Sequence, residues 1–132
     1  MGARVLIAED EESILASLEF LVTRAGYEAR LARDGVQALE QVAAFRPQLV
    51  ILDLMLPGKS GLEVCAAIRA NPGWSSTRVL MLTARGGMKE VSRGLAAGAD
   101  DYVAKPFSTQ DLMARARMLL EDVPGGAREA AP

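Results

Sequence analysis

Five polar side chains stand where strand-like runs of this chain end. Glu9 and Asp10 follow one apolar run, and Asp53 follows another. Thr83 and Lys105 end two later runs. In a parallel sheet the carboxyl ends of the strands share one edge, and ligands bind there. We therefore expect these five side chains to converge on one site.

Their types indicate metal-assisted phosphoryl chemistry. Three carboxylates form an oxygen-rich site, and because the chain has no histidine and one cysteine, Mg²⁺ is the natural ion for Glu9, Asp10 and Asp53. A carboxylate can also act as a nucleophile and form an aspartyl-phosphate, and Asp53 is the candidate. Lys105 would neutralise phosphoryl charge, and the Thr83 hydroxyl would donate to a phosphoryl oxygen.

Each of these side chains also has a purely structural interpretation. Glu9 and Asp10 could cap a helix, and Asp53 could form an Asx turn. Thr83 could simply end a strand, and Lys105 could be a solvated surface lysine. A shared site is favoured because all five stand along the same predicted sheet edge.

Composition narrows the class of protein. The 132 residues suit one domain with one core, and 50% of them are apolar. A net charge of −2 argues against a dedicated nucleic-acid binder. The single cysteine, Cys65, fits a reducing compartment. Without a long apolar span or a signal-peptide pattern, we expect a cytoplasmic protein that makes no membrane contact.

The elements that would position the site alternate between strands and helices. Apolar residues at three-to-four spacing predict a helix after every strand, with Asp34 and Ser108 as caps and Gly26 and Gly98 at helix ends. Such alternation predicts an α/β domain with a parallel sheet covered on both faces. The expected strands are 5–8, 27–31, 49–52, 78–83 and 101–104.

The domain is expected to span residues 1–121. Residues 122–132 are rich in small residues, Gly and Pro, which is typical of a flexible tail or a truncated linker. Gly86 and Gly87 provide a flexible junction after Thr83.

Four segments, in this order, resemble the receiver domain of two-component response regulators. The resemblance covers Val5 to about Leu120 and implies the flavodoxin-like fold, a doubly wound (βα)5 domain with strand order 2-1-3-4-5. Val5–Glu11 resembles the family's first strand with its acidic pair, and Asp53–Gly61 resembles the phospho-acceptor loop. Leu82–Ala84 resembles the switch threonine with a small residue after it, and Gly98–Phe107 resembles the last strand with its lysine.

The resemblance implies a function and a partner. Asp53 would accept a phosphoryl group from a phosphohistidine on a sensor histidine kinase or phosphotransfer protein, in a Mg²⁺-dependent reaction. The Met55 carbonyl would be a further Mg²⁺ ligand. Ala84 would leave room for the phosphoryl group, and Pro106 would follow Lys105 through a cis peptide bond. Beyond slow autodephosphorylation, no enzymatic activity is expected.

The resemblance also implies a switch. Thr83 would move toward the phosphoryl group, and Tyr102 would swing inward into the space it leaves. The face formed by the fourth helix, the last strand and the last helix would then change.

The same face could form a phosphorylation-dependent homodimer. Asp101, Asp111 and Arg115 resemble charged positions that receivers of winged-helix transcription factors use for pairing head to head. Two positions depart from that pattern, because Val91 and Ala97 replace charged residues. The alternative is that all three charges are solvated and contribute little.

Two competing functions remain. The chain could be the excised receiver of a longer DNA-binding winged-helix transcription factor, in which case this chain alone would not bind nucleic acid. It could instead be a Mg²⁺-dependent phosphatase with an aspartate nucleophile. Such enzymes usually carry a second acid two residues after the nucleophile, where this chain has Met55.

Overall fold

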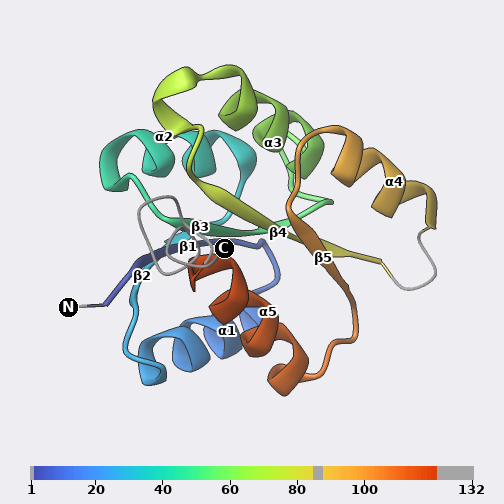
Figure 1. The fold of residues 1–132 in the computed structure, drawn as a ribbon. Coiled ribbons are helices and arrows are strands. Elements are labelled where there is room, and N and C mark those ends of the chain that lie inside the picture. Colours follow the sequence, from blue (N-terminus) through green and yellow to red (C-terminus); the bar gives the residue numbers. More distant parts are fainter. Residues whose placement is uncertain (1, 85–87, 122–132) are drawn as a thin grey trace, which may run out of the picture.

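Strands and helices alternate along the chain, five of each in the residues that the structure describes (Figure 1). The structure is a computed structural model and describes residues 2–84 and 88–121. The strands are β1 (Arg4–Ala8), β2 (Glu28–Ala32), β3 (Leu49–Asp53), β4 (Arg78–Thr83) and β5 (Asp101–Ala104). The helices are α1 (Glu12–Arg24), α2 (Gly35–Phe45), α3 (Gly61–Ala70), α4 (Met88–Ala96) and α5 (Thr109–Glu121).

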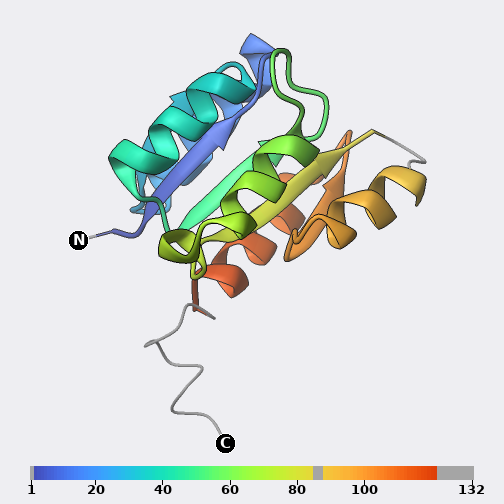
Figure 2. The same cartoon turned by 90° about the horizontal axis from the view of Figure 1, so that it is seen from above.

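The strands form one parallel sheet in the order β2-β1-β3-β4-β5. Helices α1 and α5 cover one face, and α2, α3 and α4 cover the other (Figures 1 and 2). The predicted doubly wound fold is therefore confirmed. The order reverses beside β1 and β3, so the carboxyl ends of these two strands lie at the topological switch point.

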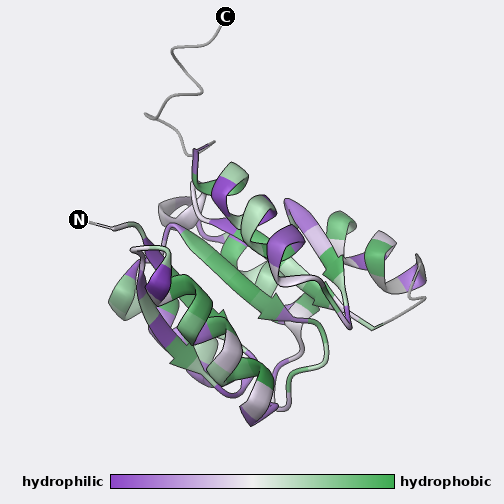
Figure 3. Cartoon of the chain, turned by 90° about the horizontal axis from the view of Figure 1, so that it is seen from below, coloured by the Kyte–Doolittle hydropathy of each residue, from purple (hydrophilic) through white to green (hydrophobic). Residues whose placement is uncertain are grey.

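The core has two halves, one on each face of the sheet. Side chains alternate along a strand, so in β1 Leu6 and Ala8 pack toward α2 and α3, whereas Val5 and Ile7 pack toward α1 and α5. All of β3 is buried, which is typical of a central parallel strand. Figure 3 shows the hydrophobic colour running along the centre of the sheet.

Local signals set several helix ends. Asp34 caps α2 by accepting the Gln37 N–H at 2.7 Å. Ser60 forms a capping box with Glu63 at the start of α3. Gly26 has a positive φ of 94° just after α1, where the left-handed conformation favours glycine. These local features confirm the predicted boundaries to within a residue or two, and β2 begins one residue later than predicted.

Trp74, predicted in a loop, lies in a short 3-10 turn, η1 (Pro72–Trp74). The Gly86–Gly87 junction and the tail 122–132 lie outside the described residues. Within the described residues, none of the helices has the length and apolar character needed to span a membrane.

Candidate functional site

The five predicted side chains all lie at the carboxyl-terminal edge of the sheet. Asp53 ends β3 and Thr83 ends β4, while Glu9 and Asp10 follow β1 and Lys105 follows β5. Glu9, Asp10 and Asp53 can each offer one carboxylate oxygen so that the three oxygens lie within 4.8 Å of one another. The fold thus brings Asp53 beside Glu9, which lies 44 residues earlier in the sequence, and beside Asp10.

Lys105 links two of these acids. Its Nζ lies 3.0 Å from Glu9 Oε1 and 3.1 Å from Asp53 Oδ2. Glu9 is fully buried and Asp53 is 4% exposed, so both charges are largely removed from water. A buried carboxylate needs a counter-charge or hydrogen bonds, and Lys105 supplies the counter-charge to both. The surface-lysine interpretation of Lys105 is therefore wrong.

Glu9 is the most constrained of the acids. Its Oε2 accepts the Glu11 N–H at 2.9 Å. Burial raises the pKa of the Glu9 carboxyl, and the negative charge of Asp53 adds to the rise, while the Glu11 N–H and Lys105 oppose it. Asp10, in contrast, is exposed and its side chain forms no hydrogen bond or ion pair within residues 2–84 and 88–121. Asp10 is therefore the acid best placed to bind a ligand from solvent.

The Lys105 ammonium is held in its charged form. Burial lowers the pKa of Lys105, but the hydrogen bond with Glu9 and the charge of Asp53 outweigh it, so the pKa is raised overall. A permanent positive charge beside Asp53 suits the neutralisation of an incoming anion.

The loop after β3 fixes the Asp53 carboxylate. Its Oδ1 accepts the Met55 N–H at 3.2 Å, an i to i+2 bond of the Asx type. The Leu54 carbonyl accepts the Gly61 N–H at 2.9 Å. A Cβ at Gly61 would overlap the Asp53 carbonyl and the Leu54 backbone, so only glycine fits this approach. Asp53 is thus both a turn residue and part of the site, and the role of Gly61 had not been predicted.

Thr83 presents an unused hydrogen-bonding group. It is 1% exposed, and its Oγ1 has no hydrogen-bond partner among the described residues. A buried hydroxyl without a partner is unusual and calls for an explanation. Ala84 follows it and is exposed. The Lys105–Pro106 peptide bond is cis, as predicted.

A crevice separates Thr83 from Tyr102. Both residues line it together with Met81, Val91 and Leu95, and it is too narrow for a water molecule. Tyr102 is 37% exposed, so its side chain lies largely outside the core here. The two predicted switch residues are therefore neighbours along one crevice.

The three charges predicted on a dimer face form a network within one chain. Arg115 Nη1 donates to Asp101 at 2.9 Å, and Arg115 Nε donates to Asp111 at 3.1 Å. The hydrogen bonds with Asp101, and then those with Asp111, raise the pKa of Arg115. This network joins β5 to α5 and lies apart from the acid cluster. The three charges are paired rather than freely solvated.

The acid cluster fits a hard divalent cation. All three side chains offer oxygen, which Mg²⁺ prefers, and one of them faces solvent. The orphaned Thr83 hydroxyl and the Lys105 ammonium leave two donors for an anion beside that cation. The Met55 carbonyl as a further ligand stays a prediction.

Comparison with known proteins adds an independent observation. Residues 5–117 match the family described as "Response regulator receiver domain". Response regulator MprA of Mycobacterium ulcerans is 43% identical over 120 residues, which cover 91% of this chain. The match covers 51% of MprA, so this chain spans about half the length of that curated relative.

Two solved structures share the fold. The chemotaxis response regulator CheY4 of Vibrio cholerae has a TM-score of 0.84 and 30% identity, covering 90% of this chain and 99% of that one. The receiver domain of a sensor histidine kinase from Pseudomonas aeruginosa has a TM-score of 0.83 and 28% identity, covering 91% and 98%. That second structure has a magnesium ion coordinated in its active site cleft.

Proposed function

Because the chain belongs to the response regulator receiver domain family, we propose that Asp53 is its phospho-acceptor. The donor would be a phosphohistidine on a sensor histidine kinase or phosphotransfer protein. The observation that carries this proposal is the position of Asp53 Oδ2, 3.1 Å from Lys105 Nζ within the acid cluster. The matched family is a signalling family, which disfavours the phosphatase alternative.

The chemistry assigned to Asp53 is a nucleophilic displacement. A carboxylate oxygen of Asp53 forms a bond to phosphorus while the phosphorus–nitrogen bond of the phosphohistidine breaks. The electron pair of that bond returns to the histidine ring. Lys105 balances the charge that collects on the phosphoryl oxygens, and the free Thr83 hydroxyl donates to one of them.

Glu9, Asp10, Asp53 and the Met55 carbonyl would hold Mg²⁺. When bound, the ion supplies positive charge that stabilises the transferring phosphoryl group. Asp10 would bind it directly because its carboxylate is exposed and unpaired within the described residues. Glu9 would bind it directly or through water, since Lys105 already contacts Glu9.

The output of the site would be a change on the face formed by α4, β5 and α5. Thr83 would turn toward the phosphoryl group, and Tyr102 would move inward along the crevice that the two share. A phosphorylation-dependent homodimer through this face would require the network of Asp101, Asp111 and Arg115 to exchange partners between two chains.

A second candidate role is the receiver part of a longer DNA-binding regulator. It is favoured by the length of MprA, since this chain matches only 51% of it. In that role a following domain would contact DNA, and the residues described here would not. Either role would place the chain in the cytoplasm, together with the phosphohistidine of the kinase or phosphotransfer protein that donates the phosphoryl group.

The proposal is tested with acetyl phosphate and intact-mass measurement. We expect wild type to gain one phosphoryl group when Mg²⁺ is present and none when EDTA removes the metal. Asp53→Ala should gain none under either condition, while Glu40→Gln, which changes an exposed acid on α2, should behave as wild type. Modification of Asp53→Ala to the wild-type extent would refute the assignment.

A further inference from the structure

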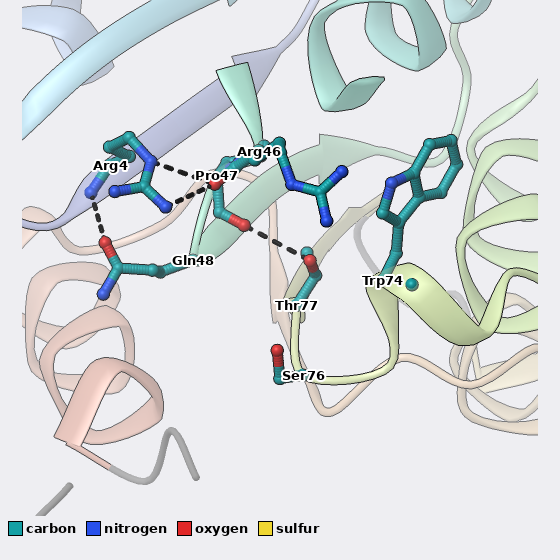
Figure 4. Close-up of a pocket in the computed structure, with 8 residues that line it drawn as sticks. Arg4, Arg46, Pro47, Gln48, Trp74, Ser76 and Thr77 are labelled. Carbon is teal, nitrogen blue, oxygen red and sulfur yellow. Dashed lines mark hydrogen bonds between the residues drawn. The ribbon is translucent and has the colours of Figure 1, made fainter. Parts of the chain in front are cut away.

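A second pocket, of about 120 Å³, lies at the amino-terminal edge of the sheet (Figure 4). Arg4 begins β1, Gln48 precedes β3 and Thr77 precedes β4, so this pocket is at the opposite end of the strands from Asp53. The phosphoryl chemistry proposed above uses none of its residues.

The pocket offers hydrogen-bond donors and positive charge. Its lining includes Arg4, Arg46, Gln48, Trp74 and Ser76, and none of the described residues that line it is acidic. Within residues 2–84 and 88–121, the Arg46 guanidinium and the Trp74 indole N–H have no hydrogen-bond or ion-pair partner. Arg46 is exposed, so its guanidinium is open to solvent beside the half-buried indole and can pair with a planar anion that enters the pocket.

Arg46 holds an uncommon backbone conformation at the end of α2. Its φ of 51° and ψ of 62° are left-handed, a conformation that glycine adopts far more readily at helix ends. The Arg46 carbonyl accepts hydrogen bonds from Arg4 Nε at 3.0 Å and Arg4 Nη2 at 2.8 Å. Figure 4 shows the Arg46 side chain extending from this turn toward the Trp74 indole. The hydrogen bonds from Arg4 therefore hold the turn from which the Arg46 side chain leaves α2.

The wall that carries Trp74 is also fixed. The Trp74 backbone N–H donates to the Asn71 carbonyl at 3.0 Å, and the Trp74 carbonyl accepts the Thr77 backbone N–H at 3.1 Å. The Thr77 hydroxyl donates to the Pro47 carbonyl at 3.2 Å, which ties this turn to the segment that carries Arg46. Because both walls are already ordered, the protein would lose little conformational entropy when a ligand binds.

We propose that this pocket binds a small organic monocarboxylate with a flat apolar group. The carboxylate would pair with the planar guanidinium of Arg46, which matches it in charge and in geometry. The flat group would lie against the Trp74 indole. The volume corresponds to about four water molecules at roughly 30 Å³ each, enough for a carboxylate and part of a ring. This site is independent of the proposed phosphorylation of Asp53.

The test uses Trp74 as the reporter, because it is the only tryptophan in the chain. Titration with benzoate should change the Trp74 fluorescence and the indole N–H resonance in a saturable way. Benzamide has the same shape without the charge, and acetate has the charge without the ring. Each should bind more weakly, benzamide by roughly 10- to 100-fold, the range expected when a charged hydrogen bond is lost.

Arg46→Gly is the matched variant. Glycine adopts the left-handed conformation easily, so the end of α2 and the thermal unfolding temperature should be retained while the guanidinium is lost. Benzoate binding should weaken by roughly 10- to 100-fold in Arg46→Gly. It should be unchanged in Arg93→Gln, which removes an exposed arginine of α4.

Several results would overturn the site. They are an unresponsive Trp74 up to the solubility limit of benzoate, equal affinity for benzamide or inorganic phosphate, and full benzoate binding by folded Arg46→Gly.

Discussion

Lys105 Nζ lies 3.1 Å from Oδ2 of Asp53, although 52 residues separate the two in sequence. Lys105 also contacts Glu9, so one ammonium serves two buried carboxylates. The site is therefore partly neutralised without a metal, and it keeps one exposed acid, Asp10, for an incoming cation. This arrangement makes the edge of the sheet ready for both a cation and an anion.

The close approach of Gly61 to the Asp53 loop predicts a cost for Gly61→Ala. The added Cβ would overlap the Asp53 carbonyl and the Leu54 backbone, so we expect a loss of roughly 1–3 kcal/mol in the free energy of unfolding, as in other overpacked sites. Urea unfolding measures it. Gly94→Ala is the control, because its Cβ would lie 3.7 Å from Met81 and alanine should stabilise α4 by up to about 1 kcal/mol. Equal stability of both variants would contradict this packing.

The buried thiol of Cys65 should lower the free energy of unfolding at alkaline pH. Burial raises the pKa of the Cys65 thiol to about 11. The unfolded thiol ionises first, near its ordinary value of about 8.5, so the unfolded state binds fewer protons between that pH and the folded pKa. Stability should therefore fall as pH rises from about 8.5 to 11, by roughly 3–3.5 kcal/mol in total, because each pKa unit corresponds to about 1.4 kcal/mol.

The measurement for Cys65 is the unfolding free energy of wild type and Cys65→Ala from pH 7 to 11. The variant has a constant deficit from the lost side chain, so the slopes are compared rather than the offsets. The gap between the two should narrow as pH rises. Parallel curves would show that the thiol does not ionise differently in the folded state.

Mg²⁺ should stabilise the domain through Asp10. A ligand that binds only the folded state adds about 2.7 kcal/mol at a concentration one hundred times its Kd. Loss of a hydrogen bond that supports a metal ligand typically weakens metal binding by roughly 10- to 100-fold. Asp10→Asn removes a ligand itself, so Mg²⁺ binding should weaken by at least that much. Since Asp10 is exposed and unpaired in the described residues, the metal-free stability should hardly change.

Thermal unfolding with Mg²⁺ and with EDTA checks this prediction, with Glu40→Gln as the control acid. An undiminished Mg²⁺ response in Asp10→Asn would exclude Asp10 as a ligand.

The ion pairs of Arg115 lead to a prediction for the oligomeric state formed through the α4, β5 and α5 face. Without a phosphoryl group its guanidinium is satisfied within the chain by Asp101 and Asp111, so we expect a monomer. With the phosphoryl mimic beryllofluoride we expect a dimer, and Arg115→Ala should prevent it. Gel filtration with light scattering distinguishes the two states. A wild type that stays monomeric with beryllofluoride bound would rule out this dimer.

The sequence was sufficient for the features that depend on local order. Gly26, Asp34 and Ser60 act on neighbouring residues, and alternation of strands and helices places every strand end on one edge. The convergence of Asp53 with Lys105 followed from that topology.

Contacts that depend on packing between distant segments could not be predicted. The Arg46 backbone is held by Arg4 from another element, and no local motif marks it. The pairing of Arg115 with Asp101 inside one chain depends on how α5 lies against β5. Gly61 was visible as a residue of the loop motif, but its closeness to the Asp53 carbonyl arises only when the loop folds back.

The position of the phosphoryl group shows directly whether Asp53 is the acceptor. After reaction with acetyl phosphate and Mg²⁺, borohydride would reduce an aspartyl-phosphate to homoserine, and peptide mass spectrometry would find its position. We predict homoserine at position 53 and at no other acid, and none when Mg²⁺ is withheld. Homoserine at position 10 or at another acid, with Asp53 unchanged, would show that Asp53 is not the acceptor.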